Sequence, residues 1–232
     1  MMTVIFSWLF SLLFPWVFLL ALGLSFGTRG YAKAEEKRFS FLTMFPQELF
    51  DGKDSSRVGA RLFIYGYAFL DAFIGCFPLV VGFLPQSFLP FAVLFLVFGV
   101  VKNASLIVLV RAPAYEFKPH LLAFVVYAGF SVLSMTMAAI LFVNLRIYSQ
   151  TLAVVFTVLA GLLCIGELFV IVNPKLSQWT KLRASVDAEG NVDTSRPRPF
   201  VLAFSEWILF ALSTLGTLVG ILGFTLLALS AI

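Results

Sequence analysis

Four ionisable side chains interrupt long apolar stretches of the sequence and are the best candidates for chemistry: Asp71, Lys102, Glu167 and Glu206. A charged residue at the centre of a membrane helix costs roughly 2.5–3.5 kcal/mol, so such residues normally face the interior of a helix bundle and have partners there. Carboxyl and amino groups in that position can exchange protons, bind cations or hold helices together.

The four side chains are predicted to lie at one depth. With a rise of 1.5 Å per helical residue, counted from the nearest basic residue of a flanking loop, Asp71 lies about 15 Å and Lys102 about 13–14 Å into the membrane. Glu167 and Glu206 each lie about 12 Å in by the same count. The sequence therefore predicts one polar layer, displaced from the midplane towards the basic loops.

Asp71 and Lys102 are predicted to form a salt bridge. They lie about fifteen and about sixteen or seventeen residues from a tight turn near Pro85, so two antiparallel helices would bring them within a few Å of each other along the axis. Small residues around both positions permit close approach of the helices. They are Ala68, Ala72, Gly75, Gly99 and Ser105. The pair either serves a function or only fixes the helix packing.

Glu167 and Glu206 are then left without an evident cation. Burial and a neighbouring like charge both disfavour a charged carboxylate, so at least one is expected to be protonated at neutral pH, and the two would titrate together. One interpretation is a structural hydrogen bond to a neighbouring helix, and another is the handling of protons or cations. A third is that Glu206 reaches the membrane surface.

Six apolar runs carry these residues and predict an all-α, polytopic membrane helix bundle. Of the 232 residues, 61% are hydrophobic and 12% charged, whereas soluble domains are about 25% charged. A bilayer core about 30 Å thick requires roughly 20 helical residues. The runs cover residues 4–24, 61–83, 88–110, 120–143, 151–172 and 200–230. We expect residues 1–232 to form a single domain with six transmembrane helices.

Basic residues predict the orientation. Fourteen of the sixteen Lys and Arg residues lie in, or at the edge of, loops 25–60, 111–119 and 173–199, and only Arg146 lies on the other side. The positive-inside rule then places these loops in the cytoplasm and both termini outside (N-out/C-out), in the cell membrane or another inner-type membrane. The same bias accounts for the pI of about 9.2, so no nucleic-acid partner is predicted.

The first run lacks the preceding positive charge of a signal peptide and is expected to be retained.

Two further features bear on packing and partners. Residues 39–50 combine seven large apolar side chains with Pro46, which suits either a segment in the lipid headgroup layer or a loop folded onto the helix ends. Two small-xxx-small pairs predict close helix contacts, either within the chain or with a second copy or another membrane protein. They are Gly23 with Gly27 and Gly216 with Gly220.

No motif identifies a reaction, and no catalytic residue, metal site or cofactor is predicted. The only histidine, His120, follows Pro119 at a helix start. The leading hypothesis is a small transporter or channel component whose polar layer handles protons or cations. The alternative is a non-catalytic membrane subunit or scaffold of a larger complex, and a lipid-processing membrane enzyme comes third. A water path to the polar layer would favour the first, and a dry core would favour the second.

Overall fold

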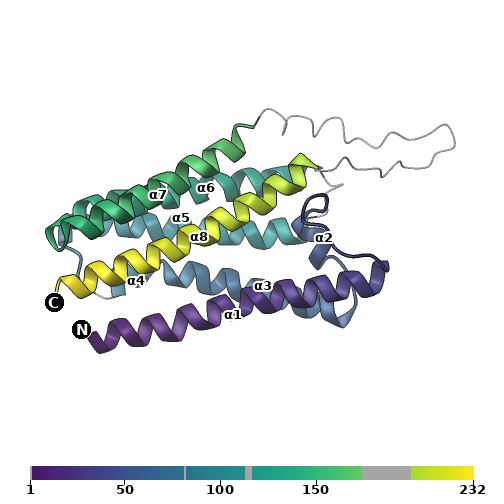
Figure 1. Ribbon diagram of the computed structural model, residues 1–232, viewed down its shortest axis with the longest axis horizontal. Coiled ribbons are helices and arrows are strands. Elements are labelled where there is room, and N and C mark those ends of the chain that lie inside the picture. Colours follow the sequence, from purple (N-terminus) through teal and green to yellow (C-terminus); the bar gives the residue numbers. More distant parts are fainter. Residues whose placement is uncertain (1, 81, 113–116, 174–199) are drawn as a thin grey trace.

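In the computed structural model, which describes residues 2–80, 82–112, 117–173 and 200–232, every regular element is a helix. The long helices lie side by side, with both chain termini at one end of the bundle and α2 at the other (Figure 1). We call these the terminal end and the α2 end. The elements are α1 (Met2–Glu35), α2 (Pro46–Phe50), α3 (Ser55–Ile74), α4 (Phe77–Val80), η1 (Gln86–Phe88), α5 (Leu89–Arg111), α6 (Phe117–Asn144), η2 (Leu145–Ile147), α7 (Gln150–Ile171) and α8 (Val201–Ser230).

Five helical segments in the described ranges are long and apolar enough to cross a membrane. They are Ser7–Glu35, Gln86–Arg111, Pro119–Ile147, Gln150–Ile171 and Val201–Ser230. The prediction of an all-helical, membrane-type bundle is thus confirmed in its coarse form. The predicted run 61–83 is not among the five, because α3 carries three charged residues and ends at Ile74, one turn before the short helix α4.

Helix boundaries follow local sequence chemistry. Asp54 caps α3, its side chain accepting a hydrogen bond from the Arg57 backbone N–H at 3.0 Å, and Ser149 caps α7 in the same way. Such caps satisfy amide groups that have no partner inside the helix. Pro90 stands in the first turn of α5, where its missing N–H is not needed. These signals fix where the ionisable residues fall on their helices.

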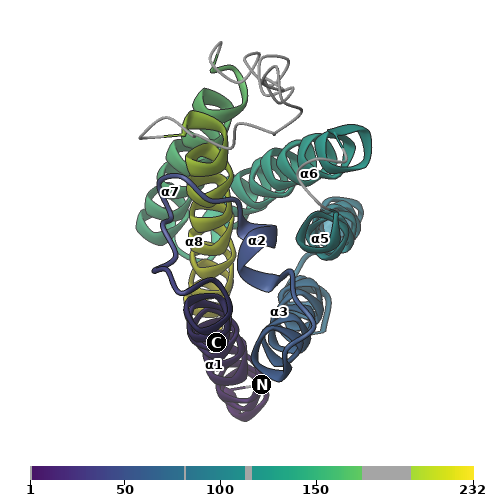
Figure 2. The same cartoon turned by 90° about the vertical axis from the view of Figure 1, so that its right-hand side faces the viewer.

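The helices pack in a closed order. α3 lies between α1 and α5, α5 packs on α6, α6 on α7, and α7 on α8, while α8 also contacts α1 and α6 (Figure 2). In the most apolar window of α8, 56% of the residues are buried, against 17% in α7. α8 is therefore the central helix of the bundle, and its buried face is the place to look for a site.

The four predicted packing glycines all have contacts within the chain. Gly23 faces Ile64 of α3, and a Cβ added there would lie 2.8 Å from the Ile64 side chain. Gly27 faces Leu49, Gly216 faces Met135 and Gly220 faces Phe95. Both small-residue faces thus serve contacts inside the bundle.

Residues 39–50 fold onto the helix ends at the α2 end. Phe45, Leu49 and Phe50 are all less than 5% exposed. The placement of this segment in a headgroup layer is therefore wrong for these three residues, because they fill the space between α1, α3, α5 and α8. Of the predicted cytoplasmic loops, residues 113–116 and 174–199 lie outside the described part of the chain.

Candidate functional site

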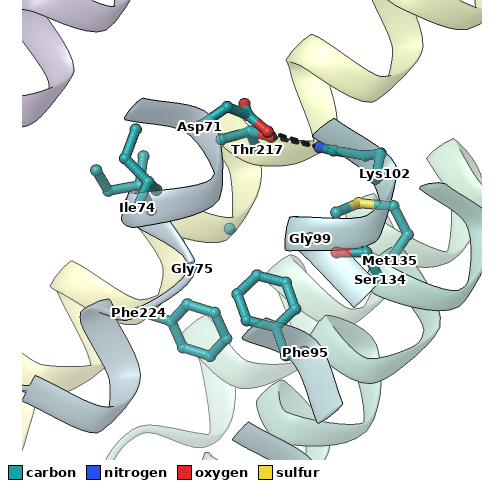
Figure 3. Close-up of a pocket in the computed structure, with 12 residues that line it drawn as sticks. Asp71, Ile74, Gly75, Phe95, Gly99, Lys102, Ser134, Met135, Thr217 and Phe224 are labelled. Carbon is teal, nitrogen blue, oxygen red and sulfur yellow. Dashed lines mark hydrogen bonds and ion pairs between the residues drawn. The ribbon is translucent and has the colours of Figure 1, made fainter. Parts of the chain in front are cut away.

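Asp71 and Lys102 form the predicted ion pair. The Lys102 Nζ lies 2.8 Å from the Asp71 Oδ2, and both residues are about nineteen-twentieths buried (Figure 3). The Asn103 amide donates to the same oxygen at 2.7 Å, and the Trp16 indole N–H donates to Oδ1 at 3.1 Å. The ammonium group also donates to the Thr217 hydroxyl at 3.3 Å.

These contacts explain how two charges can be buried together. A buried ion pair is stable only when further hydrogen bonds satisfy its remaining polar atoms. Three donors surround the Asp71 carboxyl group, which suits an ionised carboxylate. The partners come from α1, α5 and α8, so the pair links four helices. Sequence analysis found Asp71 and Lys102 but not Trp16, Asn103 or Thr217, which have no unusual feature in the sequence.

A small cavity adjoins the ion pair. Its volume is about 20 Å³, and Asp71, Lys102 and Thr217 line one side of it. The rings of Phe95 and Phe224 close the other side (Figure 3). A cavity of roughly 10–15 Å³ or more can hold a water molecule when polar partners surround it. This one has the size and the partners for a single water molecule.

Glu206 lies near the α2 end and is paired with His120. The carboxylate Oε1 is 2.7 Å from the imidazole Nε2, and the other ring nitrogen lies 3.1 Å from the Ala112 carbonyl oxygen. His120 and Glu206 are both no more than 2% exposed. The expectation that Glu206 lacks a basic partner is therefore wrong, and so is the interpretation that it reaches the surface. The pairing had one signal in the sequence. His120 and Glu206 each lie within the first two turns of a helix, and both helices begin at the α2 end of the bundle.

Glu167 has a partner of its own. The Ser131 hydroxyl donates to its Oε1 at 2.6 Å, and its Oε2 has no hydrogen bond from a described residue. Lys102 lies within electrostatic range of this carboxyl group. Glu167 and Glu206 thus bind different groups on α6, contrary to the expectation that they form one coupled pair.

Glu206 lies apart from the other three ionisable residues: Lys102 is paired with Asp71 and lies within electrostatic range of Glu167, whereas Glu206 lies towards the α2 end of α8. Glu206, Ser213 and Thr217 are spaced by seven and four residues and so share one face of the helix. Eleven residues separate Glu206 from Thr217, which is about 16 Å of helix. The prediction of one depth is therefore wrong for Glu206. Asp71 is sixteen residues from the start of α3, whereas Glu206 is only five from the start of α8.

Tyr127 and a second cavity adjoin the face of α8 that carries Glu206 and Ser213. The Tyr127 phenol lies against the Ser213 hydroxyl, midway between Glu206 and Thr217 along α8. The second cavity, of about 10 Å³, is lined by Glu206 and Tyr127 and lies beneath Pro46 of α2. We use the name polar file for the set His120, Glu206, Tyr127, Ser213, Thr217, Lys102 and Asp71.

The polar file ends at an aromatic cluster. Phe224 packs against Phe95, with ring centroids 5.6 Å apart, and against Phe142 at 4.7 Å, and Phe156 adds a fourth ring. From Gly220 to the terminal end, the buried described residues of α8 are apolar apart from Thr225. Buried polar groups therefore lie between the α2 end and the ion pair, and the buried face of α8 beyond the pair is mostly apolar.

Comparison with known proteins gives no guide to this arrangement: no family model, characterised protein or solved structure matches the chain. Within the described ranges, no three His, Cys, Asp or Glu side chains gather as the ligands of a metal ion would. The chemistry of the site has to be argued from its own geometry.

Proposed function

We propose that the chain is a six-crossing membrane protein with both termini outside and its basic loops in the cytoplasm. α3 with α4 would supply the sixth crossing, since α3 packs along α1 and α5. An even number of crossings is supported by the two termini lying at one end (Figure 1). In this orientation the α2 end is cytoplasmic, because it carries the exposed basic residues that follow α1.

Within that frame, the proposed function is proton or small-cation handling, as a small transporter or channel component. The observation that carries this proposal is the polar file, which leads from His120 and Glu206 to the Asp71–Lys102 pair along one face of α8. Intramembrane carboxyl and imidazole groups arranged in a chain are typical of proton relays. The file extends over about 16 Å along α8, so it reaches from the α2 end to the ion pair.

The groups present suggest how protons would move. His120 and Glu206 share a hydrogen bond of 2.7 Å, so a proton taken up by the imidazole can pass to the carboxylate. A water molecule beside Glu206 and the hydroxyls of Tyr127, Ser213 and Thr217 would continue the chain to Lys102, which would pass one of its protons to the Asp71 carboxylate and take up the arriving proton in its place. At each step one O–H or N–H bond breaks as the next forms. The second carboxylate oxygen of Glu206, which has no partner among the described residues, is free to take part.

Proton flux into liposomes tests this proposal. We expect flux driven by a potassium diffusion potential in the parent protein and a fall to background in Glu206→Gln and Asp71→Asn. Glu36→Gln is the matched control, because Glu36 is exposed and lies outside the spans. A parent flux that neither buried substitution changes would overturn the proposal. Absence of flux from the parent would do the same for transport by the chain alone.

The second candidate is a non-catalytic membrane subunit of a larger complex. It is favoured by the aromatic cluster, which closes the terminal half, and by cavities that each hold about one water molecule at most. In that case the polar file would fix the helix packing. The flux experiment separates the two, since a structural file leaves the parent without flux but makes Asp71→Asn less stable to heat.

A further inference from the structure

The cytoplasmic end of the polar file is covered by residues 39–50, which we call the cover segment. Its short helix α2 sits between α1, α3, α5 and α8 at that end (Figure 2). The Phe45 ring packs edge-on against the His120 imidazole, with centroids 5.6 Å apart, and against Phe200 at 5.4 Å. Pro46 and Phe50 form the roof of the cavity that Glu206 lines. Together with Phe200 and Leu202 of the same apolar cluster, the cover segment thus lies between Glu206 and the end of the bundle.

Different kinds of contact hold the base of the cover segment and its middle: ion pairs and hydrogen bonds at the base, and in the middle mainly the packing of aromatic rings, including Phe39 and Phe41 on Trp207. Arg57, which is 6% exposed, forms an ion pair with Glu35 at 3.1 Å, donates to the Asp51 carbonyl oxygen and stacks on the Tyr31 ring. These contacts hold the end of α1 to the start of α3. The middle is also held to α8 by two hydrogen bonds of 2.9 Å, from the Trp207 indole to the Met44 carbonyl and from the Phe200 amide to the Leu42 carbonyl.

Gln47 destabilises the observed position of α2, in which the cover segment lies over the cavity. It is 2% exposed, and neither atom of its side-chain amide has a hydrogen-bonding partner among the described residues. A buried polar group without a partner loses its hydrogen bonds to water and gains none in return, which is unfavourable. Because water would satisfy this amide as soon as α2 moved outwards, the unpaired Gln47 favours opening.

We propose that the cover segment is a gate: outward movement of α2 and Phe45, between fixed anchors at Arg57, gives water access to His120 and Glu206. The proposal rests on the proposed function for what then enters, a proton or small cation. Access itself is a property of the fold and can be measured separately.

Thiol labelling measures access. In a chain carrying Cys76→Ala and Cys164→Ala, the substitution Ala203→Cys places a thiol beside Phe45, at a position that is fully buried in the closed form. The reporter is labelled in lipid nanodiscs with a small charged methanethiosulfonate reagent. Adding Phe45→Ala should raise the labelling rate at least tenfold, whereas Leu42→Ala, an exposed position of the same segment, should leave it unchanged.

Gln47→Met should change the labelling rate in the opposite direction to Phe45→Ala. It replaces the unpaired amide with an apolar side chain of similar length, so it should slow labelling of the reporter below the parent rate. A misfolded variant would be labelled faster, so slower labelling cannot come from damage. Labelling at the parent rate with Phe45→Ala, or faster labelling with Gln47→Met, would overturn the gate.

A disulfide crosslink tests whether movement of the cover segment is needed for proton flux. Leu42→Cys with Phe200→Cys joins two positions already linked by a backbone hydrogen bond, and their disulfide should stop proton flux until a reductant is added. Flux that persists in the fully oxidised protein would overturn the gate. If no variant shows flux, the proposed function fails, while the labelling rates still decide whether the cover segment opens.

Discussion

Removal of the Lys102 ammonium group should strongly destabilise the bundle. Lys102→Met keeps most of the side-chain volume but leaves the Asp71 carboxylate buried without its cation, bound only by Trp16 and Asn103. Breaking one partner of a buried ion pair typically costs about 3–5 kcal/mol. For a chain of this length, one kcal/mol corresponds to about 2–4 °C in the unfolding midpoint, so a fall of roughly 6–20 °C is expected.

The measurement is thermal unfolding of the purified protein in one detergent at constant pH, followed by tryptophan fluorescence. Lys37→Met is the matched control, since Lys37 is exposed beyond the end of α1 and should not change the midpoint. The double variant Asp71→Asn with Lys102→Met removes both charges. It should recover at least half of the loss, because no charge is left unpaired, although the single oxygen of the new amide can accept the hydrogen bond of only one of the two donors, Trp16 or Asn103.

Two results would refute this reasoning. If Lys102→Met unfolds within about 2 °C of the parent, which is less than 1 kcal/mol, the ion pair does not hold the helices together. If the double variant is less stable than Lys102→Met, the unpaired carboxylate is not the source of the loss. Either result would remove the structural basis of the polar file.

Packing and topology supply the remaining predictions. Gly223→Ala should lower the unfolding midpoint by an amount equivalent to about 1–3 kcal/mol, because the added Cβ would lie 2.6 Å from the rigid ring of Phe142. Gly161→Ala, which meets nothing within 4 Å, should leave the midpoint unchanged or raise it slightly. For the topology, in a cysteine-free background, an impermeant thiol reagent applied outside intact cells should label Gln150→Cys and not Lys53→Cys. The reverse pattern would invert the proposed orientation.

The helices and the Asp71–Lys102 ion pair can be predicted from the sequence, because both depend on residues that are close along the chain. Apolar runs of more than twenty residues leave little choice of structure in lipid. Asp71 and Lys102 lie on helices joined by a short connection, so counting residues from the turn is enough to bring them together. The pair was identified without knowing how any other helix packs.

The histidine partner of Glu206 could not be predicted in the same way. His120 and Glu206 lie on α6 and α8, which are separated by α7 and a long loop, so their contact depends on the order in which the helices pack. The depth estimate failed for a related reason. The count began at Arg61, six residues inside α3, for Asp71, but at a residue outside α8 for Glu206, so equal counts did not mean equal positions along the bundle. Asp71 is sixteen residues from the start of α3, whereas Glu206 is five from the start of α8.

The asymmetry of the bundle limits what the polar file can do. From the α2 end, ionisable and hydroxyl groups reach the Asp71–Lys102 pair, and beyond it four aromatic rings leave no buried ionisable side chain among the described residues. In the proposed function, a proton entering from the α2 end would meet polar groups as far as the ion pair and mostly apolar buried side chains beyond it. Such a path loads a buried site from one side. Passage across the membrane then requires the rings of Phe95 and Phe224 to separate, which makes the cavity beside Asp71 the place where inward and outward access would alternate.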